Sequence, residues 1–463
     1  MKGKLILFRS RMAVVGGAVI AAGLVLSGCS GSGGDGGSGG GKGGEGSEST
    51  AAEGAVLGQV PMAKVSEMSG AMGMWVTKKN FVKNELKKIV GYSPDGTRTQ
   101  WQIPLGGETC WASPEPTKDG LIAVVFKNGK DDTPVCTEIG VVDLNKGTMR
   151  WHKQSRKDGS ARMFDEVVIG GGTVAASGTG ESAGWTVDGK PLWQSAYGKK
   201  CEEQGYAGSD DKLIAVRNCG ELKHPRLDLQ TVDPKTRAVK SSYKLPAGTQ
   251  YAHVMSTDPL VVAIDNGHAQ GGSGASEILS IDDSAPRGRL LGRIGTSGGK
   301  HGKYDIDCPA TNVPGCSQFA VSKKTGTLFL PTNDPADGSS EAKNDIVAFS
   351  LKTGKQTGTV EGTDAGRLFP VGTDENGQVS VYQEGDDLSE KGGAVWRIDP
   401  AAYKKTKVLQ IPDASSKAET RFEMDRRVLF AGERLYIGAD HVTEPSTVYK
   451  EKQPLAMVFG PKK

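Results

Sequence analysis

Short apolar runs separated by turn residues dominate the chain after residue 54. A typical run ends at an Asp, passes through a few residues that include Gly or Pro, and often continues to a Trp. The clearest copies span Tyr92 to Trp101, Val141 to Trp151 and Trp185 to Trp193. An apolar run, a turn and a second run predict two antiparallel strands joined by a tight connection.

Weaker copies of this Asp-turn unit centre on Asp233, Asp282, Ser350 and Asp399. Neighbouring centres, starting from Asp95, are 45 to 49 residues apart, except for one spacing of 68 between Asp282 and Ser350. A hairpin that recurs at such a period is typical of a β-propeller. We therefore predict an all-β fold of four-stranded antiparallel blades, and we interpret the long spacing as an insertion.

Each unit also contains an apolar run that fits a middle strand. These runs are residues 121–126, 173–176, 213–216, 260–264, 327–330, 379–382 and 434–437. The last run needs a partner, which residues 455–459 supply, and that unit then lacks a fourth strand. Residues 55–61 fit the empty place and would close the ring. Eight blades with this N-terminal clasp is the preferred prediction, and seven blades is the alternative.

The first 28 residues follow the pattern of an export leader, with basic residues through Arg11 and an apolar run of 14 residues from Ala13 to Leu26. This run is too short to span a bilayer as a mature helix. The Leu-Ser-Gly-Cys that ends at Cys29 resembles the lipobox of bacterial lipoproteins. The resemblance implies that Cys29 is diacylated and becomes the first mature residue. An ordinary cleaved leader with a chance cysteine is the alternative.

Gly and Ser dominate residues 29–54, which cannot bury apolar surface and are predicted to form a flexible tether. Its root-mean-square reach would be roughly 25 to 30 Å. Lipobox and tether together are similar to those of surface lipoproteins of high-GC Gram-positive bacteria. The predicted organisation is a leader (1–28), a lipidated cysteine with tether (29–54) and one propeller domain (55–463), held at the extracytoplasmic face of the cell membrane.

The net charge of +3 includes the leader. Without the four basic residues of the leader, the 57 bases fall to 53, against 54 acids. No basic field then remains to hold a nucleic-acid backbone, so nucleic acid is not an expected partner.

The cysteines other than Cys29 form three close sequential pairs: Cys110 with Cys136, Cys201 with Cys219, and Cys308 with Cys316. An exported chain with an even number of cysteines most simply holds disulfides. Six cysteines allow about 15 pairings, and the neighbour pairing suits a repeat because each bridge stays within or beside one blade. A metal site would need C-x2-C or nearby Cys/His sets, which the sequence lacks.

Two sets of connections differ in length. In a four-stranded antiparallel blade, the turns between strands one and two and between strands three and four lie on one face, and these are short here. The interblade links and the turns between strands two and three lie on the other face. Several of these are long: residues 127–135, 266–276, 333–344, 384–393 and 441–453. All six paired cysteines map to that face, so we expect binding there. The alternative is that the loops are tolerated insertions and the bridges only staple the fold.

The stretch Val141 to Trp151, VVDLNKGTMRW, resembles the repeat of the pyrroloquinoline-quinone-like propellers, and the resemblance covers most of residues 75–460. It implies that Asp bonds the backbone of its own turn, Gly takes the strained position, and Trp packs between blades. The quinone enzymes of that family also carry adjacent cysteines and a calcium site, but this chain has no Cys-Cys and no C-x-x-C-H. The resemblance therefore points to non-catalytic members, such as the propeller lipoprotein of outer-membrane assembly, and no cofactor is expected.

Isolated motifs for other enzymes are incomplete. Residues 93–97 resemble the sialidase Asp box, but Asp95 and Gly96 are adjacent where the motif separates them by one residue. Gly295 to Gly299 match G-x-S-x-G around Ser297, without the strand–turn–helix context that the motif requires.

Candidate metal ligands are equally scattered. The loop acids Asp334, Asp337 and Glu341 could meet a calcium ion, although we interpret them, like the pairs Asp131-Asp132 and Asp386-Asp387, as solvated loop charges. No H-x-x-x-H pair occurs among the six histidines, which are His152, His224, His253, His268, His301 and His441.

The sequence thus favours a non-catalytic, lipid-anchored, disulfide-containing propeller that binds a protein or cell-envelope ligand on its loop-rich face. One alternative is a hydrolase or lyase with side chains converging on the central channel; another is the extracellular sensor subunit of a membrane system. An enzyme should direct several His, Asp or Glu side chains into the channel from first strands. A scaffold should have a plugged or featureless channel.

Overall fold

The structure is a computed structural model that describes residues 51–462 apart from 130–134, 179, 196–197, 199, 222, 268–273, 297–302, 334–342, 364, 423–425 and 443–452. The chain divides after Ser47 into two units, and every described residue lies in the second. The predicted leader, Cys29 and most of the predicted tether therefore lie outside the described residues.

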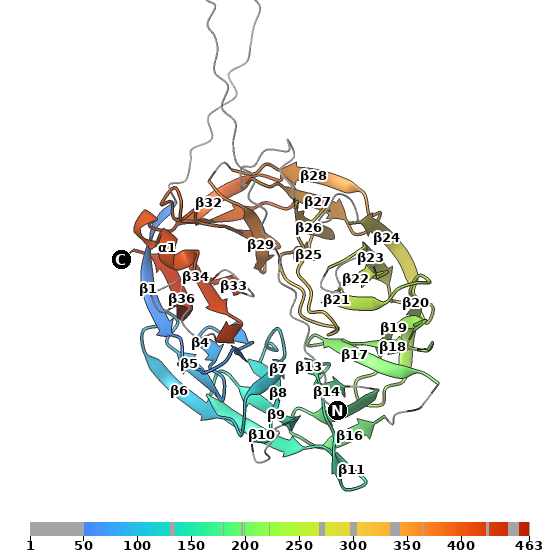
Figure 1. Ribbon diagram of the computed structural model, residues 1–463. Helices are drawn as coiled ribbons and strands as arrows, with labels where there is room; N and C mark the ends of the chain where they lie inside the picture. Colours follow the sequence, from blue (N-terminus) through green and yellow to red (C-terminus); the bar gives the residue numbers. More distant parts are fainter. Residues whose placement is uncertain are drawn as a thin grey trace, which may run out of the picture. The chain divides into compact units, whose positions relative to one another are not determined.

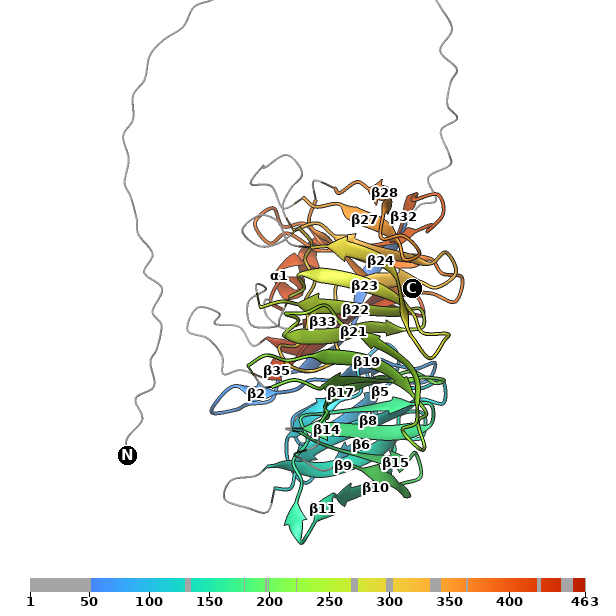
Figure 2. The same ribbon diagram turned by 90° about the vertical axis from the view of Figure 1, so that its right-hand side faces the viewer.

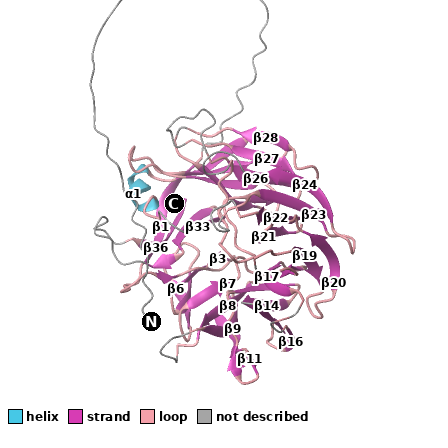
Figure 3. Ribbon diagram, turned by 45° about the vertical axis from the view of Figure 1, so that its right-hand side comes forward, coloured by secondary structure: helices cyan, strands magenta, loops and turns pink. Residues whose placement is uncertain are grey.

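Four-stranded antiparallel sheets follow one another around a ring in the second unit (Figure 1), which confirms the predicted all-β propeller. Six of these blades are separate sheets, and one eight-stranded sheet contains two further four-stranded sets, in agreement with the preferred number of eight. The helical elements of the described residues are the short α1 (Ser416–Glu419), visible in Figure 3, and the 3-10 turn η2 (Asp413–Ser415). In the described part of the chain no helix has the length and hydropathy to cross a membrane.

The blades are numbered here in chain order from β3, and each is given from its innermost to its outermost strand. Blade 1 comprises β3 (Met74–Val76), β4 (Phe81–Asn84), β5 (Lys88–Tyr92) and β6 (Thr99–Pro104); blade 2 comprises β7 (Thr109–Ala112), β8 (Leu121–Lys127), β9 (Cys136–Asp143) and β10 (Thr148–Gln154); blade 3 comprises β13 (Glu166–Gly170), β14 (Thr173–Gly178), β15 (Glu181–Thr186) and β16 (Pro191–Gln194); blade 4 comprises β17 (Glu202–Gly208), β18 (Leu213–Asn218), β19 (Leu227–Val232) and β20 (Val239–Lys244).

The second half of the ring follows the same order. Blade 5 comprises β21 (Tyr251–Thr257), β22 (Leu260–Asp265), β23 (Glu277–Asp282) and β24 (Arg289–Gly295); blade 6 comprises β25 (Ala320–Ser322), β26 (Thr327–Pro331), β27 (Ile346–Ser350) and β28 (Gln356–Val360); blade 7 comprises β29 (Leu368–Thr373), β30 (Val379–Gln383), β31 (Ala394–Ile398) and β32 (Lys405–Gln410); blade 8 comprises β33 (Arg426–Ala431), β34 (Arg434–Ala439), β36 (Pro454–Pro461) and β1 (Ala52–Pro61). Two short ribbons pair β2 (Ser69–Gly70) with β35 (His441–Val442) and β11 (Arg156–Lys157) with β12 (Ser160–Ala161).

Burial explains why the middle strands read as continuous apolar runs. All seven predicted runs form second strands, and β8 is buried in every residue but its last. The outer strand β10 instead alternates between exposed and half-buried residues. The inner strands of a blade are covered on both faces by the neighbouring blades, whereas the outer strand reaches the rim.

Ring closure depends on β1, which is the predicted N-terminal clasp. It pairs antiparallel with β36 from Gly54 opposite Pro461 to Pro61 opposite Pro454. β1 begins three residues earlier than the predicted clasp, because Ala52 and Glu53 also pair in parallel with the end of β32. This overlap joins blades 7 and 8 into the eight-stranded sheet.

The hydrophobic core is divided among the interfaces between blades. One cluster joins blades 1 and 2, another joins blades 2 and 3, and the largest joins blades 7, 8 and 1 across the closure. Similar clusters fill the remaining interfaces. Stability therefore comes from each blade packing on its neighbours, and an open end would expose an apolar face.

The tryptophans of the repeated unit pack between blades. A Cβ added at Gly147 in blade 2 would lie 2.2 Å from the Trp101 ring of blade 1. A Cβ added at Gly189 in blade 3 would lie 3.0 Å from the Trp151 ring of blade 2. The Trp151 indole N–H also donates to the Val187 carbonyl oxygen across the interface at 2.8 Å. Trp101 and Trp151 thus each pack against a glycine of the next blade, whereas Trp193 packs against Arg237.

The Asp of the unit organises its own turn. The Asp143 Oδ1 atom accepts hydrogen bonds from the backbone N–H groups of Asn145 and Lys146 at 3.1 and 3.0 Å. Asp233 and Asp399 bond their turns in the same way. These contacts match the architectural roles expected for the repeat.

We call the face that carries the interblade links and the turns between second and third strands the loop-rich face, and the opposite one the plain face. Figure 2 shows the two faces edge-on: α1, β2 and β35, which belong to the loop-rich face, lie on the left, and the C-terminus lies on the right. The excess of the 68-residue spacing lies in the link 296–319 between β24 and β25, which confirms an insertion within the fold.

Substitution of Gly147 by Ala should lower the free energy of unfolding by about 2 to 5 kcal/mol, because the new methyl group meets Trp101 at a backbone φ of +68°. Gly326→Ala is the matched control: its φ is +63° and no atom lies within 4 Å of the added Cβ. It should cost only about 1 to 2 kcal/mol of backbone strain. Urea unfolding of both variants measures the difference, and equal losses would contradict the role of Trp101.

Candidate functional site

A central plug crosses the channel at the loop-rich face. We use this name for residues 303–319, the described part of the long link between blades 5 and 6. Figure 1 shows the segment inside the ring, between β25 and β17. A disulfide joins Cys308 to Cys316 within this segment.

The base of the plug is fixed to blades 6 and 7. Tyr304 forms a β-bridge with Thr332 at the end of β26. The Arg367 guanidinium, directly before β29, donates to the Asp305 carboxylate at 2.9 Å. These contacts hold one end of the plug against the first strands on its own side of the ring.

The tip of the plug is clamped by blades 3 and 5. One peptide group, between Asn312 and Val313, is held on both sides: its N–H donates to Glu166 Oε2 at 2.8 Å, and its C=O accepts from His253 Nδ1 at 2.7 Å. The Val254 N–H of β21 donates to the Val313 carbonyl oxygen at 2.8 Å. Since Glu166 and His253 belong to the first strands β13 and β21, the plug reaches across the channel.

Glu166 is the centre of this clamp. Its carboxylate also accepts the Tyr206 N–H at 2.7 Å and the Ser177 hydroxyl at 3.0 Å. Burial raises the pKa of Glu166 from 4.5 to about 7, while these hydrogen bonds and that of Val313 oppose the rise. Gly205 is required beside it, because a Cβ there would lie 2.1 Å from the Glu166 carboxylate.

Glu166 and His253, which both lie on first strands, therefore bond the backbone of the plug. Within the described ranges, no three His, Cys, Asp or Glu side chains gather closely enough to hold a metal ion.

The other candidate residues lie apart from the plug. Asp95 Oδ1 accepts hydrogen bonds from Ser93 at 2.5 Å and from Thr97 at 2.8 Å, which lowers the pKa of Asp95 to about 2 and makes it part of a turn on the plain face. The four described histidines lie on four separate elements: His152 on β10, His224 in the turn after β18, His253 on β21 and His441 on β35. Ser297, Asp131, Asp132, Asp334, Asp337, Glu341, His268 and His301 lie outside the described residues.

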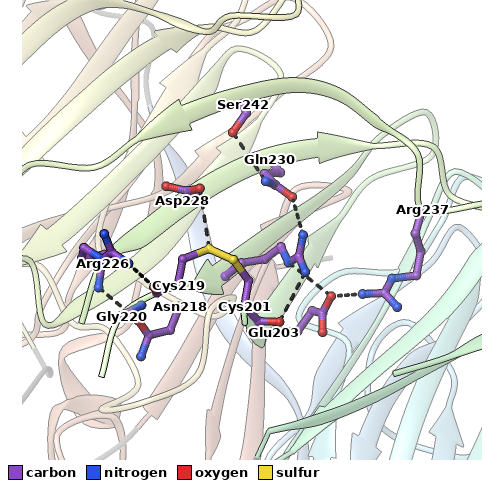
Figure 4. Close-up of a disulfide and its surroundings, with 11 residues drawn as sticks. Cys201, Glu203, Asn218, Cys219, Gly220, Arg226, Asp228, Gln230, Arg237 and Ser242 are labelled. Carbon is purple, nitrogen blue, oxygen red and sulfur yellow. Dashed lines mark hydrogen bonds and ion pairs between the residues drawn. A yellow bond between two sulfur atoms is a disulfide. The ribbon is translucent and has the colours of Figure 1, made fainter. Parts of the chain in front are cut away.

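All three disulfides belong to the loop-rich face, and they join Cys110 to Cys136, Cys201 to Cys219 and Cys308 to Cys316. The second one links the start of β17 to the end of β18 in blade 4 (Figure 4). Beneath it, the buried Glu203 carboxylate pairs with the guanidinium groups of Arg217 and Arg237. The disulfide thus ties β17 to β18, and the ion pairs connect Glu203 of β17 with Arg217 of β18 and with Arg237 of the turn between β19 and β20.

Exposed apolar side chains gather on the same face. Of the six large hydrophobic residues that are exposed in the described chain, four lie in loop-rich connections: Met68, Val135, Met163 and Leu388. The other two, Val56 and Val239, lie on outer strands. Phe164 donates its N–H to the Cys136 carbonyl oxygen, so Met163 and Val135 flank one hydrogen-bonded contact.

Two hollows also open on this face. One of about 500 Å³ is lined by Cys219, Gly220, Glu221, His224 and Arg226. The other, of about 510 Å³, lies at blade 7 and is lined by Thr363, Ala365, Gln383, Lys391, Gly392, Trp396, Lys407, Gln410 and Asp413. Both mix polar and apolar groups.

The spacing of the repeats predicted the insertion, but no pattern in the sequence marked Glu166 or Leu388. Glu166 opens an apolar strand, and Leu388 stands in a loop of charged residues. No short motif marks either one, because each acquires its role from elements distant in the sequence.

No family model and no curated protein matches the chain. Solved structures with a similar fold include BamB from Moraxella catarrhalis, with a TM-score of 0.45, 12% identity and coverage of 87% of this chain and 98% of that one. The C-terminal WD40 domain of Sif2 has a TM-score of 0.48 at 9% identity, with coverage of 88% and 99%. A chain of the mitotic checkpoint complex has a TM-score of 0.42 at 11% identity, with coverage of 73% and 92%.

The pKa of Glu166 gives a pH-dependent stability with a defined sign. The folded state holds the Glu166 proton between pH 4.5 and about 7, where the unfolded chain has lost it. Its contribution to the free energy of unfolding is fully present below pH 4.5 and is lost as the pH rises through 7, by about 3 kcal/mol. Urea unfolding from pH 4 to 8 should show this loss in the wild type. In Glu166→Gln the free energy of unfolding should fall with a smaller slope against pH. Glu419 has a similarly raised pKa and remains in both proteins, so an identical slope would contradict the assignment to Glu166.

Proposed function

We propose that this protein is a non-catalytic binding propeller, held by a lipid on Cys29 at the extracytoplasmic face of a bacterial cell membrane, and that its loop-rich face binds a protein or cell-envelope ligand. The observation that carries the proposal is the central plug. It crosses the channel where a propeller enzyme would place its reacting groups, and its backbone forms hydrogen bonds with Glu166 and His253.

The arrangement of the loop-rich face supports binding. Its connections present Met68 and Met163, whose exposed fractions are 69% and 53%, and the Phe164 N–H beside Met163 donates to the Cys136 carbonyl oxygen. Methionines adapt to varied apolar surfaces and are frequent at protein-binding sites. A connection that is held by such bonds loses little conformational entropy when a partner binds.

The position of β1 supports an anchor that leaves this face free. Gly54 pairs with Pro461, and Glu53 accepts the Lys462 N–H at 2.8 Å, so the strand begins where blade 8 would otherwise have its turn on the plain face. Figure 2 shows the C-terminus on that side of the disc. Strand β1 thus begins at the plain face.

The disulfides support the proposed location, because such bonds persist outside the reducing cytosol.

The turn-forming Asp, the glycine beside a neighbouring Trp and the interblade Trp support a PQQ-like repeat of the non-catalytic kind. A hydrolase or lyase with a central site would need the plug to leave the channel.

Binding at the loop-rich face can be tested by photo-crosslinking in cells. Crosslinkers at Met68 and Met163 should capture the same partner reproducibly, whereas crosslinkers at Lys79 and Lys190, which are exposed in plain-face turns, should not. The double substitution Met68→Ser and Met163→Ser should weaken the purified complex at least about tenfold, or 1.4 kcal/mol. Equal capture from both faces, or an unchanged affinity, would contradict the proposal.

The anchor is tested independently. Cys29→Ala should shift the protein from the membrane fraction to the soluble fraction, because an unmodified tether has no affinity for a bilayer. Immunoblotting of the two fractions measures the shift, with the wild-type chain as control. Retention of the variant at the membrane would show that the lipobox interpretation is wrong.

A further inference from the structure

A leucine of blade 7 stands almost entirely in solvent. Leu388 is 97% exposed and occupies the tip of the blade 7 loop, the name used here for residues 384–393 between β30 and β31. No other exposed large hydrophobic residue in the described chain reaches 70%. A single exposed leucine is common on protein surfaces, but the loop that carries Leu388 is held by an unusual set of contacts.

The base of the blade 7 loop is fixed by a buried carboxylate. Glu419 of α1 has no exposed surface and accepts the Tyr382 hydroxyl at 2.6 Å and the Gly393 N–H at 2.9 Å. The two ends of the loop come so close to it that a Cβ at Gly385 or Gly393 would lie 2.8 or 2.1 Å from the carboxylate. Burial raises the pKa of Glu419 to about 7.

The tip is fixed by its own hydrogen bonds. Asp386 accepts the Leu388 N–H at 2.9 Å and the Ser389 hydroxyl at 2.6 Å, and its backbone exchanges two hydrogen bonds of 2.8 Å with Lys391. The Lys391 ammonium group bonds Asp413 at 2.8 Å. The loop is therefore ordered without any packing of the Leu388 side chain, which remains available to a partner.

A hollow lies at the base of the blade 7 loop. This hollow of about 510 Å³ shares Lys391 and Gly392 with the loop, and Trp396 and Gln410 form part of its lining. One partner could therefore contact both the loop and the hollow. Apolar anchors concentrate binding energy when they enter a pocket and exclude water.

The charges around Leu388 select the partner. Asp386, Asp387 and Glu390 flank the leucine. Glu390 pairs with Lys417 of α1 at 3.5 Å and Glu384 pairs with Arg426, so Asp386 and Asp387 carry the negative charge next to Leu388. The hydrogen bond from Ser389 lowers the pKa of Asp386 and keeps it ionised. These acids would be repelled by the negative surface of an anionic membrane, so lipid is an unsuitable occupant.

We infer that the blade 7 loop is a docking element for a partner protein whose apolar pocket, edged by Lys or Arg, receives Leu388. The inference rests on the proposed binding function and specifies the contact and the chemistry of the partner. Complementary charge around a buried apolar anchor sets the orientation and raises the association rate.

The test begins with a photo-crosslinker at position 388 of the full chain in cells, with Val239 as matched control. Val239 is 48% exposed on the outer strand β20, away from the loop-rich face. Capture alone does not decide the matter. The protein captured from position 388 is purified, and its affinity for the full chain is measured by titration calorimetry at low and high salt.

Leu388→Ser and the double substitution Asp387→Lys with Glu390→Lys should each weaken that affinity at least about tenfold. Val239→Ser should change it less than about twofold. The affinity for the wild type should fall with added salt, and the charge-reversed variant should lose this dependence. Since Leu388 makes no packing contact, its variant should retain the wild-type melting temperature, which separates lost docking from lost folding.

Three results would overturn the docking element: an affinity that Leu388→Ser leaves unchanged, a salt dependence that charge reversal leaves unchanged, or crosslinks from position 388 only to lipid or to a second copy of this chain. Capture from Met163 with none from Leu388 would also exclude it, while the proposed function would survive. Absence of capture from every loop-rich position would refute both.

Discussion

Pairing of β1 with β36 is the constraint on which the other features depend. A blade buries its faces only against its neighbours, so a ring of blades has no stable end until the first and last segments of the domain meet. Residues 52–61 complete blade 8, and the first two also overlap the end of β32. The largest apolar cluster spans this junction and includes residues of blades 7, 8 and 1. Closure therefore sets the geometry of the channel and of both faces.

Closure of the ring also leaves a channel at its centre. First strands direct side chains toward a channel that must be filled by water, by side chains or by another segment. Here residues 303–319 cross it, and the buried Glu166 and His253 both bond one peptide group of that segment. Buried polar groups are tolerated when their hydrogen bonds are satisfied. The same groups that would mark an active site in an open channel hold a structural element in this one.

The two faces of the disc thus differ in construction. Short turns on the plain face, with their Asp and Gly residues, set the spacing of the blades. The loop-rich face carries the three disulfides, the plug, the exposed methionines and the blade 7 loop. Its connections are braced by the disulfides, by the Glu203–Arg217 ion pair and by the Glu419 hydrogen bonds. These contacts restrict the conformations that the connections can adopt.

The sequence by itself determined the local repeat. A strand, an Asp-opened turn and a Trp are recognisable because each depends on neighbouring residues, and their spacing indicated four-stranded blades, an insertion and a clasp at residues 55–61. The path of that insertion could not be read in the same way. The contacts of Val313 with Glu166 join residues 147 positions apart, and no local pattern encodes them. Only tertiary structure brought Glu419 to Gly393 and left Leu388 without packing, because burial is a property of the closed ring and not of any one segment.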